Sequence, residues 1–410
     1  MLPKNNETQD ALFRRLAITF FIIFVLRIGT NLPVPSINHL ELEFYIRNHS
    51  VAQNFVNIFS SNGTITISLF TLSIFPYINA SILTQLLLVT PQLSKLQKEG
   101  DLEGKRTINR LTRLLTLIAA VFQSLSIATY LKQVLFEWNY YFAFEVVLYL
   151  TTGAMIILWL SEYITDYGLG NGASLFIYIN ILSNSNAIFQ NIKAIPLLSL
   201  IILFICIGIS IFGLIFLQDG FRRIPLVSSK QLNQLAWKKN SQNYLPLRFN
   251  QAGVMPIILT TALLVIPSYV INSGLIPELS FINFQFPRIL YWIAYFSLIV
   301  IASLFYSEIV LNPKDVSEQL QKMSVTLPGI RPGTKTTFYL KRTMKRTSLL
   351  GGIALAVFVT FPNLIESQMD LAQIKGLTST SVLIATGVVL DLIREINSIF
   401  FSNVYNDLYK

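Results

Sequence analysis

Long apolar segments alternate with short polar ones along the chain. Ten segments are mostly apolar and about 20 residues long, the length that a helix needs to cross a bilayer. The segment at 173–192 is the most polar of them, because Asn and Ser residues interrupt it from Asn180 onward. The pattern predicts an all-α polytopic membrane protein with ten transmembrane helices, near residues 16–35, 67–89, 114–131, 140–160, 173–192, 197–217, 253–273, 289–311, 348–365 and 379–400.

Lysine and arginine are concentrated in blocks between the apolar segments. Blocks of this kind stay on the cytoplasmic or equivalent side of the membrane during insertion. An even number of helices also places both termini on one side, and both ends carry basic residues. The sequence thus predicts that both termini share the side of the basic blocks, which are residues 4–15, 95–113, 222–248, 314–346 and 394–410.

Composition supports the membrane assignment. The chain is 53% hydrophobic and 13% charged with a mean hydropathy of +0.56, which is too apolar for a soluble domain of this length. The net charge of +10 suits either nucleic-acid binding or the basic blocks of a membrane protein, and the topology favours the second. Cys206 is the single cysteine, so no disulfide is expected. No cleavable signal or transit peptide is predicted, because the first apolar run continues into Pro33 without a small-residue cleavage site.

Motifs for an enzyme, a metal or a nucleotide cofactor are not convincing. His39 and His49 are the only histidines, and their spacing fits no metalloprotease motif. Residues 168–173 formally match a dinucleotide-binding motif, but they join two predicted membrane helices instead of a strand and a helix. Residues 329–336 fail the spacing of a phosphate-binding loop. The sequence therefore predicts a protein that is not an enzyme and has no cofactor or metal.

Four charged residues lie within or at the ends of predicted helices: Arg27, Glu145, Glu162 and Glu308. Arg27 and Glu162 are candidates for an ion pair within a helical bundle. The alternative function, a secondary transporter of a small solute, needs charged groups near the middle of the membrane. Here the charges are mostly near helix ends, where long side chains reach the interface. A transporter is therefore disfavoured.

Two long basic segments, 222–256 and 312–346, carry the most informative polar residues. Loops of this length in a compact protein are usually either functional or disordered. Both contain Pro and Gly at spacings typical of ordered turns, as in Leu245-Pro246 and Pro332-Gly333. Their basic residues either only set the orientation of the protein in the membrane, or they also dock a large acidic partner, such as ribosomal RNA or an acidic protein surface.

Seven stretches, in the same order as in the family, resemble the SecY family of protein-conducting channels from bacteria and plastids. They span nearly the whole chain and are FTLSIFPYINASILTQLL (70–87), KEGDLEGKRTINRLTR (98–113), SEYITDYGLGNGASL (161–175), YLPLRFNQAGVMP (244–256), NPKDVSEQL (312–320), LPGIRPGTKT (327–336) and TSVLIATGVVLD (380–391). The resemblance implies two pseudo-symmetric five-helix halves that close like a clamshell. These halves would be residues 1–192 and 193–410, with long cytoplasmic or stromal loops at 219–252 and 312–347.

The resemblance also implies where the channel parts lie. A ring of β-branched side chains excludes water from an empty pore and closes around a translocating chain. The implied ring is Ile74, Ile78, Ile177, Ile258 and Ile384. A plug is expected at about 55–68, although Thr66 and Ser73 depart from the basic residue and the glycine that are common in the family. Candidate residues of a lateral gate are Ser81, Thr84, Gln85, Thr260 and Thr261.

The resemblance also implies that a ribosome or a motor protein docks on the two basic segments. The candidate docking residues for a ribosome or motor are Arg222, Arg223, Arg248, Arg331 and Lys335. Arg331 is the main candidate, because Pro332 restricts the backbone beside a side chain that can form a bidentate pair with an acid. The implied partners are a SecE-like subunit, a SecG-like subunit, a SecA-type ATPase or a ribosome, signal-sequence-bearing polypeptides and membrane lipid.

The compartment is the last expectation. The chain is rich in Ile, Asn, Lys and Phe, as AT-rich organelle genomes tend to encode, and it has only a brief tail after Asp391. The thylakoid membrane of an algal plastid is favoured over a bacterial inner membrane.

Overall fold

The computed structural model describes residues 6–34, 37, 67–87, 102–131, 139–191, 197–228, 244–261, 263, 288–368 and 379–408. Its residues form two compact units. Unit 1 contains Met1–Lys193, Ile374–Leu377 and Val388–Lys410, and unit 2 contains Ala194–Gln373 and Thr378–Gly387.

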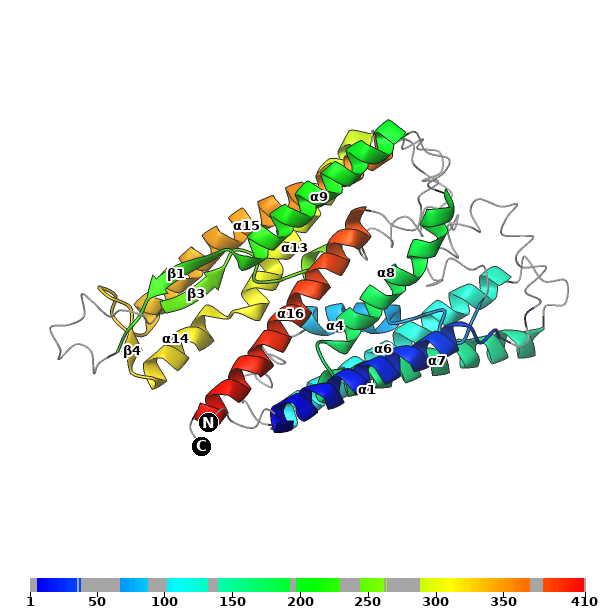
Figure 1. Ribbon diagram of the computed structural model, residues 1–410, viewed down its shortest axis with the longest axis horizontal. Helices are drawn as coiled ribbons and strands as arrows, with labels where there is room; N and C mark the ends of the chain where they lie inside the picture. Colours follow the sequence, from blue (N-terminus) through cyan, green and yellow to red (C-terminus); the bar gives the residue numbers. More distant parts are fainter. Residues whose placement is uncertain are drawn as a thin grey trace. The chain divides into compact units, whose positions relative to one another are not determined.

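Unit 1 is built from long helices. They are α1 (Asn6–Thr30), α4 (Phe75–Leu87), α6 (Leu102–Leu131), α7 (Tyr140–Tyr167), α8 (Gly172–Asn191) and the later part of α16 (Ser379–Leu408). Helix α6 packs against both α4 and α7, and α7 also packs against α1 and α8 (Figure 1). Helix α7 is therefore the central element of this unit.

Two hydrophobic clusters hold unit 1 together. In the first, Ile67 and Leu72 pack with residues of α6 and α7 such as Ile127 and Leu150. In the second, residues of α1, α7 and α8 surround Phe70 and Ile74, and the residues in contact are Ile22, Leu26, Ile157, Leu160, Ile164, Ala173, Leu175, Phe176 and Ile179. The segment before α4 contributes to both clusters, so its position is determined by packing on two sides.

Helix α4 begins later than the hydrophobic pattern indicates. The predicted helix starts at residue 67, but the first helical residue is Phe75, and residues 69–74 form turns. The Thr71 hydroxyl accepts a hydrogen bond from the Ser68 amide at 2.7 Å and donates to the Ser68 carbonyl at 2.8 Å. Side-chain bonds of this kind compete with helical ones. Ser68 also forms a β-bridge with Pro33, which joins this segment to the end of α1.

Unit 2 combines helices with short strands. Its helices are α9 (Leu197–Asp219), a short helical segment at 255–261, α13 (Arg288–Val310), α14 (Pro313–Lys322), α15 (Thr334–Gln368) and the first turns of α16. Helix α15 packs against both α9 and α13 (Figure 1). The strands are β1 (Phe221–Pro225), β2 (Val227–Ser228), β3 (Tyr244–Arg248) and β4 (Val325–Thr326), none of which the hydrophobic pattern predicts.

Helix α15 begins 14 positions before the span predicted at 348, at Thr334. Its first turns are basic but carry an apolar stripe, with Leu340 fully buried and Met344 nearly so. These positions are four apart and lie on one helical face. Mean hydropathy over a window does not detect a narrow apolar stripe in a basic segment. The segment is helical because this stripe packs into the core of unit 2.

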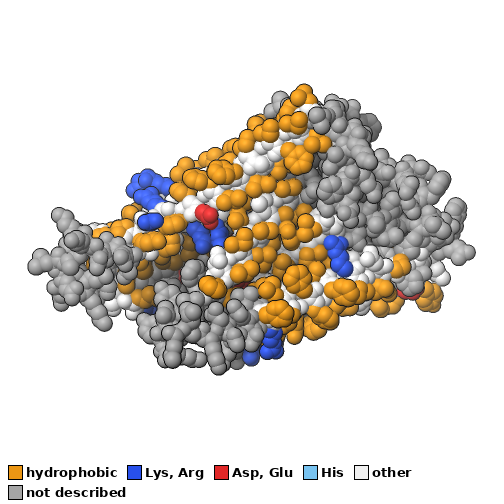
Figure 2. Space-filling view, viewed as in Figure 1, with side chains coloured by type: hydrophobic (Ala, Val, Ile, Leu, Met, Phe, Trp, Pro, Cys, Tyr) orange, Lys and Arg blue, Asp and Glu red, His pale blue; other side chains and the backbone are white. Residues whose placement is uncertain are grey.

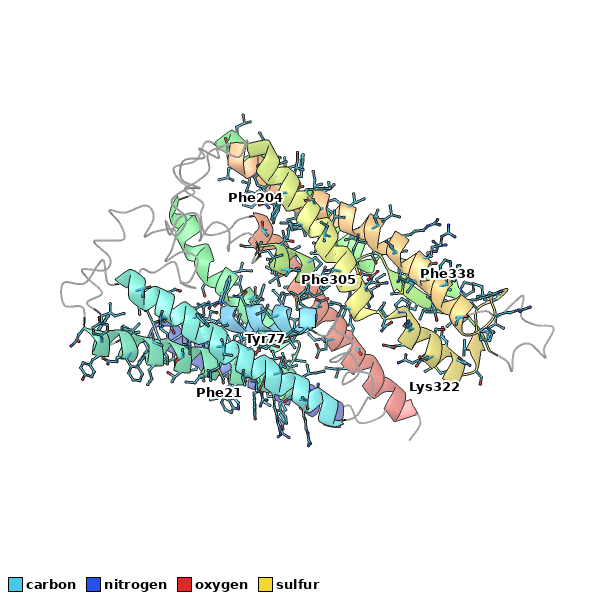
Figure 3. All side chains as sticks on the ribbon, turned by 180° about the vertical axis from the view of Figure 1, so that it is seen from behind. Phe21, Tyr77, Phe204, Phe305, Lys322 and Phe338 are labelled. Atoms are coloured by element: carbon cyan, nitrogen blue, oxygen red, sulfur yellow. The ribbon has the colours of Figure 1, made fainter. Side chains whose placement is uncertain are left out.

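Several helices are suited to a membrane. Among the described residues, five segments are long and apolar enough to cross one: Arg106–Thr129, Tyr140–Tyr167, Leu198–Asp219, Trp292–Lys322 and Thr334–Ile365. Phe21 and Phe204 are 68% and 61% exposed, and both project outward from their helices (Figure 3). Hydrophobic side chains cover much of the described surface in Figure 2. Exposed apolar surface on this scale indicates contact with lipid.

Candidate functional site

The two basic segments of unit 2 form one structure, which we call the basic platform: β1 to β4, α14 and residues 327–347. Strand β1 pairs with β3 in antiparallel register, with Phe221 opposite Arg248 and Arg223 opposite Pro246. Strand β2, which follows β1, pairs with β4 of the second basic segment. The β2–β4 pairing joins segments about a hundred residues apart in the sequence.

A hydrophobic cluster lies beneath the basic platform. Ile224 of β1 and Leu247 of β3 are buried together with Leu320 of α14 and Leu340 of α15. Leu327, in the turn after β4, is also buried in this cluster. Burial of such side chains is worth about 1.5–3 kcal/mol each. The basic side chains of both segments are therefore held on a common support.

Arg223 and Arg248 lie on the exposed face of the β1–β3 ribbon. The guanidinium carbon of Arg223 is 5.4 Å from the ring centre of Phe221 and 5.1 Å from that of Tyr244. These rings are stacked, with centres 6.0 Å apart. Cation–π contacts restrict where the Arg223 side chain can point. Arg222 is on the same strand and is exposed, but strand alternation places it on the face of Ile224.

Arg331 lies in a well-anchored turn before α15. Gly329 and Gly333 on either side have φ angles of +77° and +96°, a region in which glycine carries no steric penalty. The Arg331 carbonyl accepts a hydrogen bond from the buried Thr336 hydroxyl at 3.0 Å, and the Gly333 carbonyl accepts one from Ser317 at 3.2 Å. Within the described residues, no carboxylate lies within ion-pair distance of the exposed Arg331 side chain. Its guanidinium is presented from a fixed backbone and is available to a partner.

All five predicted docking residues lie on the basic platform and are exposed: Arg222, Arg223, Arg248, Arg331 and Lys335. Lys335 is the second residue of α15. Residues 229–243 of the predicted first loop lie outside the described residues. The aromatic residues Phe221 and Tyr244, which orient Arg223, were not among the predicted ones, because FRRIP and YLPLR show no regular alternation of apolar and polar residues that would indicate a strand.

Three of the five predicted ring isoleucines lie in unit 1 and share one cluster. Ile74 is buried, with 2% of its surface exposed, and Ile78 and Ile177 are half-buried against the same group of side chains. Ile74 immediately precedes α4, Ile78 is one turn further along, and Ile177 is on α8. Helices α4 and α8 thus each contribute to this cluster.

The other two ring candidates, Ile258 and Ile384, lie in unit 2 and are 9% and 8% exposed. Val254 approaches Gly387 of α16 so closely that a Cβ at Gly387 would be 2.8 Å from Val254 Cγ2. Ile258 follows Val254 by one helical turn, and Ile384 precedes Gly387 by about one turn. Both isoleucines therefore lie within a turn of a tight helix contact.

The predicted gate residues make hydrogen bonds within their own units. Thr84 of α4 donates to its own helix and accepts from Thr112 of α6 at 3.3 Å. Gln85 Nε2 donates to Ser81 at 3.4 Å, while the buried Gln85 Oε1 has no partner among the described residues. In unit 2, the two remaining hydroxyls donate to backbone carbonyls one turn earlier, Thr260 at 2.8 Å and Thr261 at 2.9 Å.

Buried amides gather where the segment of Ile258 begins. Gln218 is 1% exposed, and neither its Nε2 nor its Oε1 has a partner among the described residues. Asn250 Nδ2 donates to the Gly253 carbonyl at 2.9 Å, but its Oδ1 is unpartnered there as well. Unsatisfied buried groups cost about 1–3 kcal/mol each. These atoms belong to the end of α9 and to the segment just before the helix of Ile258, where backbone bonds such as Ile257 N to the Val254 carbonyl at 3.1 Å are also formed.

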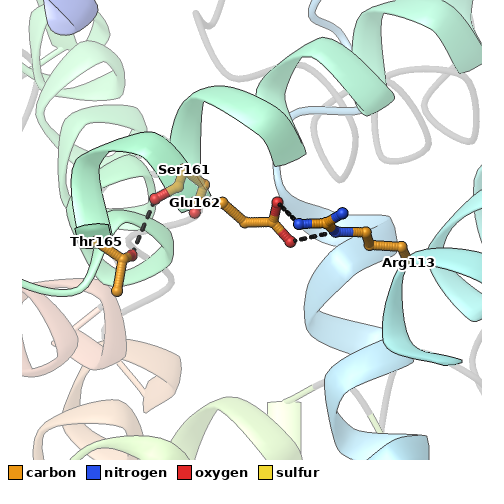
Figure 4. A network of polar contacts seen from close by, with 4 residues as sticks. All are labelled: Arg113, Ser161, Glu162 and Thr165. Carbon is orange, nitrogen blue, oxygen red and sulfur yellow. Dashed lines mark hydrogen bonds and ion pairs between the residues drawn. The ribbon is translucent and has the colours of Figure 1, made fainter. Parts of the chain in front are cut away.

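The expected pair between Arg27 and Glu162 is wrong. Glu162 of α7 forms a bidentate pair with Arg113 of α6, with Nε–Oε1 and Nη2–Oε2 distances of 2.9 and 2.8 Å (Figure 4). Arg27 instead donates to Ser183 of α8. Arg113 is the last residue of the predicted basic block 95–113, just before a span, and the sequence does not show that α6 and α7 bring it to Glu162.

Residues 55–66 of the predicted plug lie outside the described residues. Only its last two positions, Ile67 and Ser68, are described, and both are buried. They continue into the turns that precede α4.

Comparison with known proteins identifies the family. A SecY family model matches residues 68–393. The protein translocase subunit SecY of Trieres chinensis is 51% identical over 99% of this chain and 100% of its own length. That of Synechocystis is 36% identical over 97% of this chain and 94% of its own length.

Solved structures share the fold at low sequence identity. One is a SecY structure from work on how the plug domain stabilises the closed state of the channel. It has a TM-score of 0.64 at 18% identity, and the match covers 95% of this chain and 93% of that one. A Sec61 channel in a canine ribosome–channel complex has a TM-score of 0.58 at 18% identity, with the same coverage.

The fold and these matches define a multi-pass helical membrane protein of the protein-conducting channel class. The chain belongs to the SecY family. It is a channel subunit and not an enzyme, and the transporter alternative is set aside.

Proposed function

We propose that this chain is the central subunit of the Sec channel of an algal plastid thylakoid membrane. The support for this compartment is that its relatives include SecY proteins of algal plastids, such as that of Guillardia theta at 39% identity. Relatives from cyanobacteria are similar as well. A bacterial inner membrane is the alternative location.

In this proposal, the halves 1–192 and 193–410 close around a pore. Ile74, Ile78, Ile177, Ile258 and Ile384 form its constriction, and the plug at about 55–68 covers the empty channel. Isoleucine is suited to this role, because a ring of apolar side chains keeps water out without binding any peptide sequence tightly.

Lateral release of membrane segments would occur between α4 and the helix that starts at residue 255. Polar contacts between the two helices, worth roughly 0.5–2 kcal/mol each, would hold this gate closed. A signal sequence gains about 0.8 kcal/mol for each buried CH₂ group and can displace them.

The basic platform is the proposed docking surface for a SecA-type ATPase or a translating ribosome. The observation that carries this proposal is the anchored turn of Arg331, whose guanidinium faces no carboxylate among the described residues. A SecE-like subunit would clamp the two halves, and a SecG-like subunit would complete the complex. The substrates would be unfolded polypeptides with signal sequences.

The test is charge reversal at Arg331 in vesicles reconstituted with the partner subunits and the ATPase. We expect Arg331→Glu to reduce ATP-driven translocation at least tenfold, because a fixed bidentate contact is replaced by repulsion. Arg342→Glu, exposed on α15 of the same platform, is the matched control and should cost less than twofold, because diffuse attraction is screened by salt. Equal losses for the two variants would contradict a single oriented contact.

A further inference from the structure

A cavity of about 230 Å³ lies between the end of α13, the start of α14 and the first half of α15. Lys314 of α14 and Lys341 and Lys345 of α15 line it, with Glu308 of α13 as its only acidic lining residue. A water molecule in the liquid occupies about 30 Å³, so the cavity has room for a polyatomic group. The Arg331 turn does not line it.

The cavity is electrostatically suited to an anion. Three ammonium groups outnumber one carboxylate, and among the described residues no acid lies within ion-pair distance of any of the three lysines. The N-terminal end of α14, capped by the Asn312 side chain through the Lys314 amide at 3.1 Å, also lines the cavity. The positive end of that helix dipole adds to the lysine charges.

The cavity also lies where the apolar helix surfaces begin. Val310, the last residue of α13, is 55% exposed, and Leu349 of α15, one turn beyond Lys345, is 39% exposed. Deeper along these helices, Ile301 and Ile353 are exposed as well. The polar floor of the cavity is made by Ser307 and Ser348, which are hydrogen-bonded to each other. A ligand there has cationic groups on one side and lipid-facing surface on the other.

We propose that this cavity binds the anionic head group of a membrane lipid, with a phosphate or sulfonate among the three lysines. Basic pockets at the cytoplasmic ends of membrane helices bind such head groups, because lysine and arginine near the surface attract anionic lipids. The acyl chains would lie along the exposed apolar residues of α13 and α15. A free phosphate has the same charge but makes no use of this apolar surface.

The test uses the purified full chain in detergent, titrated with phosphatidylglycerol and followed by native mass spectrometry. Lys341→Gln/Lys345→Gln should weaken binding at least tenfold. The matched control, Arg342→Gln/Arg346→Gln, removes the same charge from the same turns of α15 but does not line the cavity, so binding should change less than twofold. Glu308→Gln should strengthen binding severalfold, which a misfolded variant would not do.

Two further titrations distinguish the source of the anion. Phosphatidylcholine should bind at least tenfold more weakly than phosphatidylglycerol, and inorganic phosphate at equal concentration should not displace the lipid. Equal weakening by the lysine and arginine pairs would show attraction by net charge alone and overturn the proposal. Displacement by inorganic phosphate would also overturn it, in favour of a soluble anion.

Discussion

At the scale of single residues, Ser73 is under an unusual backbone constraint. Its φ angle is +49°, which side chains other than glycine adopt rarely and at some cost. Its hydroxyl accepts a hydrogen bond from Asn180 of α8, and both groups belong to unit 1. The bond connects the turns before α4 to the helix that carries Ile177.

This arrangement predicts different outcomes for two small substitutions. Ser73→Ala should lower the free energy of unfolding by about 1 kcal/mol, because the bond is lost and the strained Cβ remains. Ser73→Gly should be nearly neutral, because glycine loses the bond but adopts this φ angle freely. Thermal unfolding of the purified protein in detergent measures both, with Asn180→Ala as a third variant that removes only the donor. If alanine proved as well tolerated as glycine, Ser73 would not be strained.

At the scale of elements, α6 and α7 are joined by the bidentate pair of Arg113 and Glu162. The side chains are 53% and 29% exposed, so solvent screens the attraction. Exposed pairs are typically worth about 0.2–1 kcal/mol, with ideal bidentate geometry at the upper end. The pair therefore orients the two helices more than it stabilises them.

A charge-swap experiment measures that contribution. Arg113→Glu should lower the free energy of unfolding by about 1 kcal/mol, because it places two carboxylates together. Adding Glu162→Arg should recover most of the loss by restoring the pair with its partners exchanged. The control is Arg110→Glu, exposed on the same helix, which Glu162→Arg should not rescue. If the change in the free energy of unfolding of the double variant equalled the sum of the changes of the two single variants, the two residues would not be coupled.

At the scale of the whole molecule, the proposed constriction draws side chains from both units. Ile78 is half-buried in unit 1, and Ile258 is buried in unit 2. Neither unit contains all five isoleucines, so a seal made by them depends on both. The ion conductance of the resting channel measures whether the seal depends on isoleucines of both units.

Replacing Ile78 and Ile258 together by glycine should raise the ion conductance of the resting channel in planar bilayers several-fold. Glycine removes the apolar side chains that exclude water from the constriction. Ile353→Gly, at an exposed position on α15, controls for the loss of helix propensity and should leave the conductance unchanged. Unchanged conductance in a correctly folded double variant would remove these residues from the ring.

The sequence by itself determined the class of the fold and the positions of most helices. Each predicted span overlaps a described helix, because about 20 consecutive apolar residues have few stable alternatives to a membrane helix. It also located the basic residues of the proposed docking surface, because charge blocks and Pro-Gly turns are local signals.

Only the tertiary structure decided how distant segments meet. The pairing of β2 with β4 joins two basic segments into one platform, and no local pattern specifies which strand finds which partner. The partner of Glu162 was mistaken for the same reason, since several arginines lie near helix ends and packing selects Arg113. The late start of α4 depends on hydrogen bonds of Ser68 and Thr71 and on packing in two clusters, which outweigh the apolar pattern that predicts a helix there.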